Sequence, residues 1–157
     1  RTVSAVTAMR NTLTAAPAVV TQAVSSIVKC TPGVESPCAI AGDSFRNCPD
    51  TASADFDEYH GKMRVPVVQS GTRPYNTEGG FVEYESGSTT QRFPSGTSGE
   101  KVKIQGSEEV CFSLAVPKSG ADIPVVIYGH GTGGNFRSAI SEGLAQRYTT
   151  QAAQKMA

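Results

Sequence analysis

The feature that most constrains the fold is a short apolar run followed at once by a glycine-rich stretch. Residues 123–128 read Ile-Pro-Val-Val-Ile-Tyr, and residues 129–134 read Gly-His-Gly-Thr-Gly-Gly. A continuous apolar run of this length is typical of a strand buried on both faces. The glycines after it allow a sharp turn with positive φ. Residues 138–156 carry apolar side chains at four-residue steps, which predict a helix with one apolar face. We therefore predict a strand, a turn and a helix in succession.

The rest of the chain shows two different patterns. Residues 2–29 have apolar side chains at three- and four-residue steps and predict a helical arm, whereas residues 30–60 are rich in turn formers and predict a loop. After residue 60 the pattern changes to that of strands, which we expect at residues 63–68, 81–85, 101–104 and 110–116. The sequence therefore predicts two domains, an arm with a loop (1–60) and a main folded part (61–157).

Four cysteines indicate the compartment: Cys30, Cys38, Cys48 and Cys111. Their spacing matches neither the close pairs of a zinc site nor a Cys-x-x-Cys redox motif, so we predict no metal and no cofactor. Three of them lie in the polar loop, where disulfides would fix a segment that cannot bury itself. We predict two disulfides and a secreted or periplasmic protein, with buried thiols in a cytosolic protein as the alternative. Of the three possible pairings, we expect Cys30–Cys38 and Cys48–Cys111.

Composition argues against a nucleic-acid partner and against a membrane-spanning segment. The chain has 157 residues, with 14 Lys+Arg and 14 Asp+Glu, so its formal net charge is zero. A nucleic-acid-binding protein normally has a basic surplus, and we expect no nucleic-acid partner. No apolar run approaches the roughly 18–20 residues that cross a bilayer, so we expect no transmembrane segment.

The glycine-rich stretch carries the motif His130-Gly131-Thr132-Gly133-Gly134, directly after the apolar run and before the predicted helix. In these residues, and in the strand predicted at 110–116, the chain resembles the lipase and esterase end of the α/β-hydrolase superfamily. The resemblance covers roughly residues 110–157. It implies an α/β fold class, namely a partial α/β-hydrolase sheet with its N-terminal strands and first helix. The helical, disulfide-tied N-terminal arm would be attached to this sheet.

The resemblance also implies roles for the motif. The backbone amide of Thr132, together with Gly131, would form the oxyanion hole that stabilises a tetrahedral intermediate. His130 would hold the loop and would not be the catalytic base, and Gly133 and Gly134 would shape the turn. The implied function is serine-type hydrolysis of a carboxylic ester in a small-molecule, lipid or polymer substrate.

The catalytic residues that such a hydrolase needs are missing from the sequence. No Gly-x-Ser-x-Gly motif occurs, and residues 96–100 come nearest but end in Glu100. We therefore expect the chain to be the N-terminal piece of a longer enzyme, with the C-terminal remainder as a second chain that supplies nucleophile, acid and base. The alternative is a non-catalytic, secreted binding or structural domain with the same fold.

Three other patterns have plainer interpretations. Gly129, Gly131 and Gly134 match the spacing of a dinucleotide-binding turn, but no strand with an acidic end follows. Residues 42–45 (Gly-Asp-Ser-Phe) and 57–60 (Asp-Glu-Tyr-His) resemble two blocks of another esterase family, yet here both lie in one loop. We expect Asp57, Glu58 and His60 to be a solvated loop edge, with His60 at the surface. Arg137 could face a carboxylate, but we expect the commoner case, an exposed guanidinium.

Overall fold

The computed structural model describes Arg10, Thr12 and residues 24–75, 77–85, 101–120 and 124–155, the last five of these by their backbone alone. The chain divides into two compact units. Unit 1 comprises Arg1–Ala23 and Arg64–Val110, and unit 2 comprises Val24–Met63 and Cys111–Ala157. The glycine-rich turn and all four cysteines belong to unit 2.

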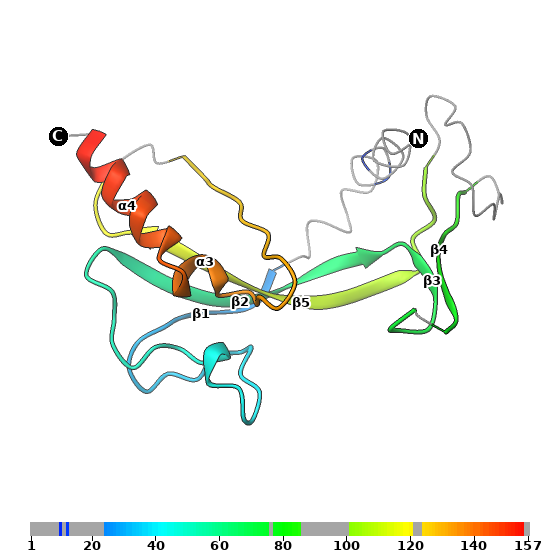
Figure 1. Ribbon diagram of the computed structural model, residues 1–157, viewed down its shortest axis with the longest axis horizontal. Helices are drawn as coiled ribbons and strands as arrows, with labels where there is room; N and C mark the ends of the chain where they lie inside the picture. Colours follow the sequence, from blue (N-terminus) through cyan, green and yellow to red (C-terminus); the bar gives the residue numbers. More distant parts are fainter. Residues whose placement is uncertain are drawn as a thin grey trace. The chain divides into compact units, whose positions relative to one another are not determined.

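Strands are the most abundant regular elements in the described structure (Figure 1). A three-stranded sheet has the order β1–β2–β5, with β1 at Val24–Lys29, β2 at Phe56–Val67 and β5 at Gly106–Pro117. Strand β1 runs antiparallel to β2. Strands β3 (Gln69–Gly71) and β4 (Gly79–Val82) form a separate antiparallel pair. Both β2 and β5 contribute residues to the two units.

The apolar core of unit 1 is small. Tyr84 and Val102 are buried and form an antiparallel bridge, and Val68 and Val82 pack against them. The Thr12 hydroxyl accepts a hydrogen bond from the Val102 amide at 2.8 Å. The predicted strand at 81–85 is thus divided between β4 and the bridge at Tyr84.

Strand β2 begins earlier than the sequence indicated, at Phe56. Phe56, Glu58 and His60 are buried, which is the two-residue alternation of a strand with one covered face. Gly61 follows, and a Cβ atom there would lie 2.6 Å from Cζ of Phe112. The missing side chain at Gly61 therefore makes room for the Phe112 ring.

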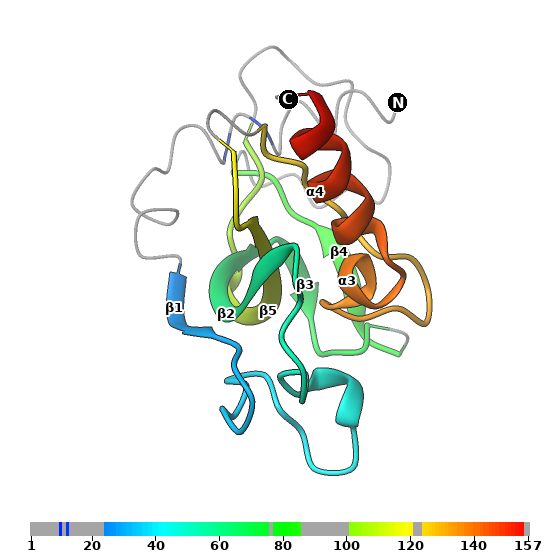
Figure 2. The ribbon, with the colours of Figure 1, turned by 90° about the vertical axis from the view of Figure 1, so that its left-hand side faces the viewer.

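The predicted helix at 138–156 is two helices, α3 (Ser138–Ser141) and α4 (Leu144–Lys155), which follow one another in Figure 2. Gly143 separates them with a φ of 74°, a left-handed conformation that a continuing helix does not use. A single-turn 3-10 helix, η1 (Ser44–Arg46), lies in the loop before β2. Among the described residues, no helix has both the length and the apolar character needed to span a membrane.

The prediction of a partial α/β-hydrolase sheet with a helical N-terminal arm is wrong. The described elements are mainly strands, and α3 and α4 are short. The end of the predicted arm is β1, whose Val28 pairs with His60 of β2. Its sequence Val-Ser-Ser-Ile-Val-Lys is rich in β-branched residues, which favour a strand where a partner strand is present. The rest of the predicted arm, apart from Arg10 and Thr12, lies outside the described residues.

The predicted strand at 123–128 is also not observed. Ile123 lies outside the described residues, and residues 124–128 belong to no strand and are exposed. By contrast, the strand predicted at 110–116 is confirmed, since it lies inside β5. An apolar run alone does not make a strand, because a strand needs a neighbour to bond its backbone.

Two disulfides are present, as predicted, but the expected pairing is wrong. The bonds join Cys30 to Cys48 and Cys38 to Cys111. The amide of Cys30 donates to the Glu58 carbonyl at 2.8 Å, which holds the end of β1 at β2. Sheet pairing of β2 with β5 brings Cys111 to the Cys38 segment, a long-range effect that the cysteine spacing does not encode.

Candidate functional site

Residues 131–134 form a tight turn. The Gly134 amide donates to the Gly131 carbonyl at 3.1 Å, and Gly133 has a φ of 81°. A positive φ at the third position of such a turn is the mark of type II geometry, which favours glycine there. Thr132 occupies the second position, so its amide takes no part in the hydrogen bond that closes the turn.

Neighbouring side chains support the turn from both ends. Nδ1 of His130 lies 3.0 Å from the Gly131 carbonyl oxygen, and the Ser138 hydroxyl accepts from the Asn135 amide at 3.0 Å. A Cβ atom on Gly134 would lie 2.8 Å from Oγ of Ser138 and 2.9 Å from Cβ of His130. Only glycine fits at this position without a shift of its neighbours.

The Thr132 amide is available to a ligand. Thr132 is exposed, and no hydrogen bond to its backbone amide occurs within the described part of the chain. Backbone donors that are held in place yet unused are what an oxyanion or another anionic oxygen requires. The side chain adds a hydroxyl at the same position.

The segment leading into the turn exposes apolar side chains to solvent. Val125 is 84% exposed and Ile127 is 93% exposed. The hydroxyl of Tyr128 donates to the Glu142 carboxylate at 3.4 Å, which connects this segment to the residue after α3. Aliphatic side chains are more often buried in proteins, so these exposed residues are a candidate contact surface.

Beyond the turn, Arg137 reaches a buried carboxylate. Its Nε lies 2.6 Å from Oε1 of Glu58, and its Nη2 lies 3.3 Å from Oε2, so the ion pair is bidentate. A third bond runs from Nη1 to the Phe45 carbonyl at 3.2 Å. The Arg137 side chain is only 13% exposed. The prediction of an exposed guanidinium is therefore wrong, because strand β2 presents Glu58 to it.

The same carboxylate continues into a buried chain of polar side chains. Nε2 of His60 lies 2.6 Å from Oε1 of Glu58, and Nδ1 lies 2.8 Å from the Ser36 hydroxyl. The prediction of a solvated edge with a surface His60 is wrong, since His60 is 0% exposed and Glu58 is buried beside it. We name Ser36, His60, Glu58 and Arg137 the ionic network.

The ionic network resembles a serine–imidazole–carboxylate triad in its order of groups. Ser36 is buried, however, and its hydroxyl oxygen accepts from the Cys38 amide at 3.1 Å. A nucleophile must reach its substrate, and these groups are closed to solvent. The network is therefore a structural element, in which every polar group has a partner.

Two opposing effects act on the pKa of Glu58. Burial raises the pKa of this carboxyl, whereas hydrogen bonds from His60 and Arg137 and the positive charge of Arg137 lower it. The second effect is larger, so the pKa of Glu58 lies below its ordinary value of 4.5. The ionised carboxylate is thus the stable form in the folded protein.

Phe136 lies between the turn and the ionic network. The Ser113 hydroxyl donates to the Phe136 carbonyl at 2.6 Å. The Phe136 ring packs edge-on against the His60 ring, with 5.0 Å between the ring centres. The Arg46 guanidinium lies 5.3 Å from the centre of the Phe136 ring. The backbone that follows the turn is therefore fixed to β5 and to the buried side of β2.

The residues of the second esterase-like pattern have ordinary roles. The Asp43 carboxylate accepts from the Phe45 amide at 3.2 Å and begins η1, as expected for a residue that ends a turn. Asp57 forms a half-exposed ion pair with Lys29 at 2.6 Å. Asp43 and Asp57 stand outside the ionic network, whereas Glu58 and His60 of the same pattern belong to it. The pattern therefore builds no second site.

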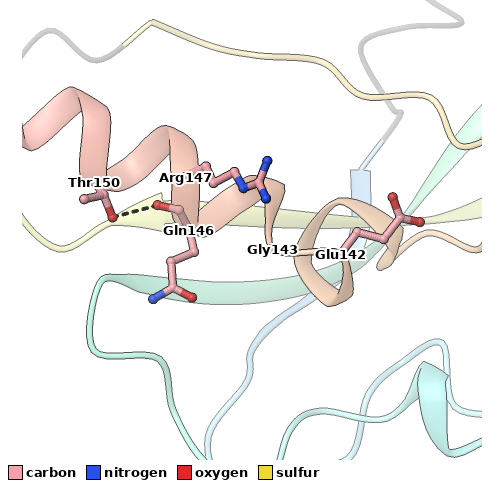
Figure 3. Close-up of a pocket in the computed structure, with 5 residues that line it drawn as sticks. All are labelled: Glu142, Gly143, Gln146, Arg147 and Thr150. Atoms are coloured by element: carbon pink, nitrogen blue, oxygen red, sulfur yellow. Dashed lines mark hydrogen bonds between the residues drawn. The ribbon is translucent and has the colours of Figure 1, made fainter.

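One shallow hollow lies beside α4 (Figure 3). It is lined by Glu142, Gly143, Gln146, Arg147 and Thr150, and the Thr150 hydroxyl donates to the Gln146 carbonyl at 2.9 Å. These residues follow one another at three- and four-residue steps along one side of the helical segment. The hollow is lined by this segment alone and is therefore open to solvent. None of the predicted site residues lines it.

The ionic network was missed by sequence reasoning, although a signal was available. Glu58 and His60 are two residues apart, and on a strand that spacing places both side chains on one face. The contributions of Ser36 and Arg137 had no local signal. They reach the network through contacts with residues 24 and 79 positions away in the sequence.

Comparisons with known proteins identify no family for this chain. No protein-family model matches it, and no similar protein was found among curated proteins or solved structures. The site is therefore interpreted from its own geometry.

Proposed function

We propose that the turn at residues 131–134 binds the negatively charged oxygen that forms during serine-type hydrolysis of a carboxylic ester. The Thr132 amide, with that of Gly131, donates to this oxygen. The observation that carries the proposal is the unused amide at Thr132, exposed at the second position of a turn that is closed by other atoms. The proposal depends on this turn and not on an α/β-hydrolase sheet.

Rigid support for the donor favours this function. An oxyanion donor stabilises a transition state only when it is already in position, since reorganisation during the reaction would cost free energy. The turn is held by His130 and Ser138, and the residues after it are fixed by Phe136 and by the Arg137–Glu58 ion pair. The ionic network thus holds the turn in position.

The nucleophile, acid and base come from another polypeptide in this proposal. The sequence has no Gly-x-Ser-x-Gly, and Ser138 near the turn is buried and bonded to the Asn135 amide. The exposed aliphatic residues Val125 and Ile127 give the second chain a contact surface directly before the turn. Two disulfides favour an exported location, where such bonds persist.

Exchange of Thr132 for proline tests the donor directly. Proline is favoured at the second position of a type II turn, so Thr132→Pro keeps the turn and removes the amide hydrogen together with the side-chain hydroxyl. In the assembly of this chain with its catalytic partner, we expect kcat for p-nitrophenyl esters to fall about 100- to 1,000-fold. Thr132→Ala is the matched control, because it keeps the amide, and its kcat should stay within a few fold of the unchanged protein.

A fluorophosphonate probe tests the location of the nucleophile. We expect it to label a serine on the second chain and no serine on this one. Full activity of Thr132→Pro would contradict the proposed role of the amide. A folded assembly that hydrolyses no ester and takes up no probe would favour the alternative, a non-catalytic binding or structural domain.

A further inference from the structure

The disulfide between Cys30 and Cys48 lies against the buried imidazole of His60. The two sulfurs and a ring nitrogen of His60 all lie within 4.8 Å of one another, and the Cys48 sulfur is 3.9 Å from Nδ1. In a tetrahedral zinc site, Zn–S distances of about 2.3 Å and Zn–N distances of about 2.0 Å place the ligand atoms about 3.5–3.8 Å apart. Small movements would bring these three atoms to that spacing.

The surroundings of His60 match those of a metal-binding histidine. A histidine that binds a metal through one ring nitrogen usually donates the hydrogen of the other to a carboxylate, which fixes the ring. Nε2 of His60 lies 2.6 Å from Glu58, and Arg137 holds that carboxylate in turn. Nδ1 is therefore the nitrogen that faces Cys48, with the Ser36 hydroxyl at 2.8 Å beside it.

We propose that Cys30, Cys48 and Nδ1 of His60 form a zinc site when the disulfide is reduced. A dithiol gives two electrons and two protons to the Cys30–Cys48 bond and becomes a disulfide itself. Zn²⁺ then displaces one proton from each thiol and binds two thiolates and the neutral imidazole. Ser36 releases Nδ1, and water takes the fourth position. Zinc and the disulfide are thus alternative cross-links between the same two cysteines.

The second disulfide has no such surroundings and serves as an internal control. Cys38 and Cys111 have no histidine or carboxylate arranged with them as a metal site in the described part of the chain. A cation lies beside Cys111 instead, with Nη2 of Arg46 3.6 Å from its sulfur. A guanidinium cannot bind a metal, so reduction at this pair leaves only two ligands.

Alkylation of the reduced, intact chain tests the proposal in one sample. The disulfides are reduced with a phosphine, which supplies the same two electrons and becomes a phosphine oxide with oxygen from water, and the protein is transferred without oxygen into buffer with or without Zn²⁺. Iodoacetamide is then added, and each cysteine is followed by peptide mass spectrometry. We expect zinc to slow alkylation of Cys30 and Cys48 at least about tenfold and to change that of Cys38 and Cys111 less than twofold. Equal rates at all four cysteines with zinc present would overturn the proposal.

Cobalt absorption gives a second readout that separates binding from general protection. Reduced protein should take up one Co²⁺ with thiolate-to-cobalt bands, and His60→Gln, which retains hydrogen-bonding groups, should lose them. Cys38→Ser with Cys111→Ser should keep these bands, whereas Cys30→Ser with Cys48→Ser should not. Thiolate-to-cobalt bands of unchanged intensity in His60→Gln would contradict the assignment of Nδ1 as a ligand.

Discussion

Two regions of unit 2 differ sharply in how far their polar and apolar groups are matched by partners within the chain. In the ionic network, charged and polar side chains are buried, and each has a hydrogen-bonding partner. In the segment at residues 124–132, aliphatic side chains are exposed and the Thr132 amide is unused. The first region is complete within this chain, whereas the second presents an apolar surface and a free donor. Under the proposed function, the exposed segment would provide the binding surface and the network would support it.

Removal of Glu58 should have the largest effect, because it leaves Arg137 buried without its partner. We expect Glu58→Ala to lower the free energy of unfolding by about 3–5 kcal/mol, measured by urea denaturation of the oxidised protein. The matched control is Asp57→Asn, the next residue on β2, whose ion pair with Lys29 is half exposed and should matter little. Equal effects of the two variants would remove the distinction between network and surface.

A smaller effect is expected at Gly61, on the same strand. A Cβ atom there would meet the Phe112 ring at 2.6 Å, so Gly61→Ala forces that ring to move. We expect a loss of about 1–3 kcal/mol in the free energy of unfolding. Gly61→Ala combined with Phe112→Leu should recover part of that loss, and no recovery would show that the clash is not the cause.

The pH dependence of stability should identify the Glu58 carboxylate. Its pKa is lowered in the folded protein from the ordinary value of 4.5, so its stabilising effect is present above that value and disappears as the pH falls through the folded pKa. The free energy of unfolding should therefore decrease on acidification below about pH 4.5. In Glu58→Gln the decrease should be shallower, and an unchanged slope would contradict the ion pair.

The smallest effect on stability is expected in the exposed segment. Val125→Ser with Ile127→Ser should change the free energy of unfolding of the chain by less than about 0.5 kcal/mol, since neither side chain is packed. The same double variant should weaken binding of the catalytic partner chain, measured by co-purification or titration. A large loss of stability in the isolated chain would instead mean that these side chains are buried in solution.

Sequence reasoning succeeded where the information is local and failed where it comes from pairing. Alternation within residues 110–116 predicted part of β5, and cysteine placement predicted two disulfides. The helical periodicity before Cys30 was misleading, because β-branched residues at 24–29 found a partner in β2. At the site, glycines and His130 were sufficient to locate the turn. The spacing of Glu58 and His60 was a signal for part of the network, but its link to Arg137 could not be found, because the two are brought together only by the folded chain.

The bond between Cys38 and Cys111 encloses most of the middle of the chain, since its two cysteines are 73 positions apart in the sequence. A protease that cut one peptide bond anywhere in that interval would produce two fragments still joined through sulfur. Such a nicked protein would run as one band on a non-reducing gel and as two after reduction. Cleavage of the chain in this interval therefore does not release a fragment, and the cut becomes visible only when the Cys38–Cys111 disulfide is reduced.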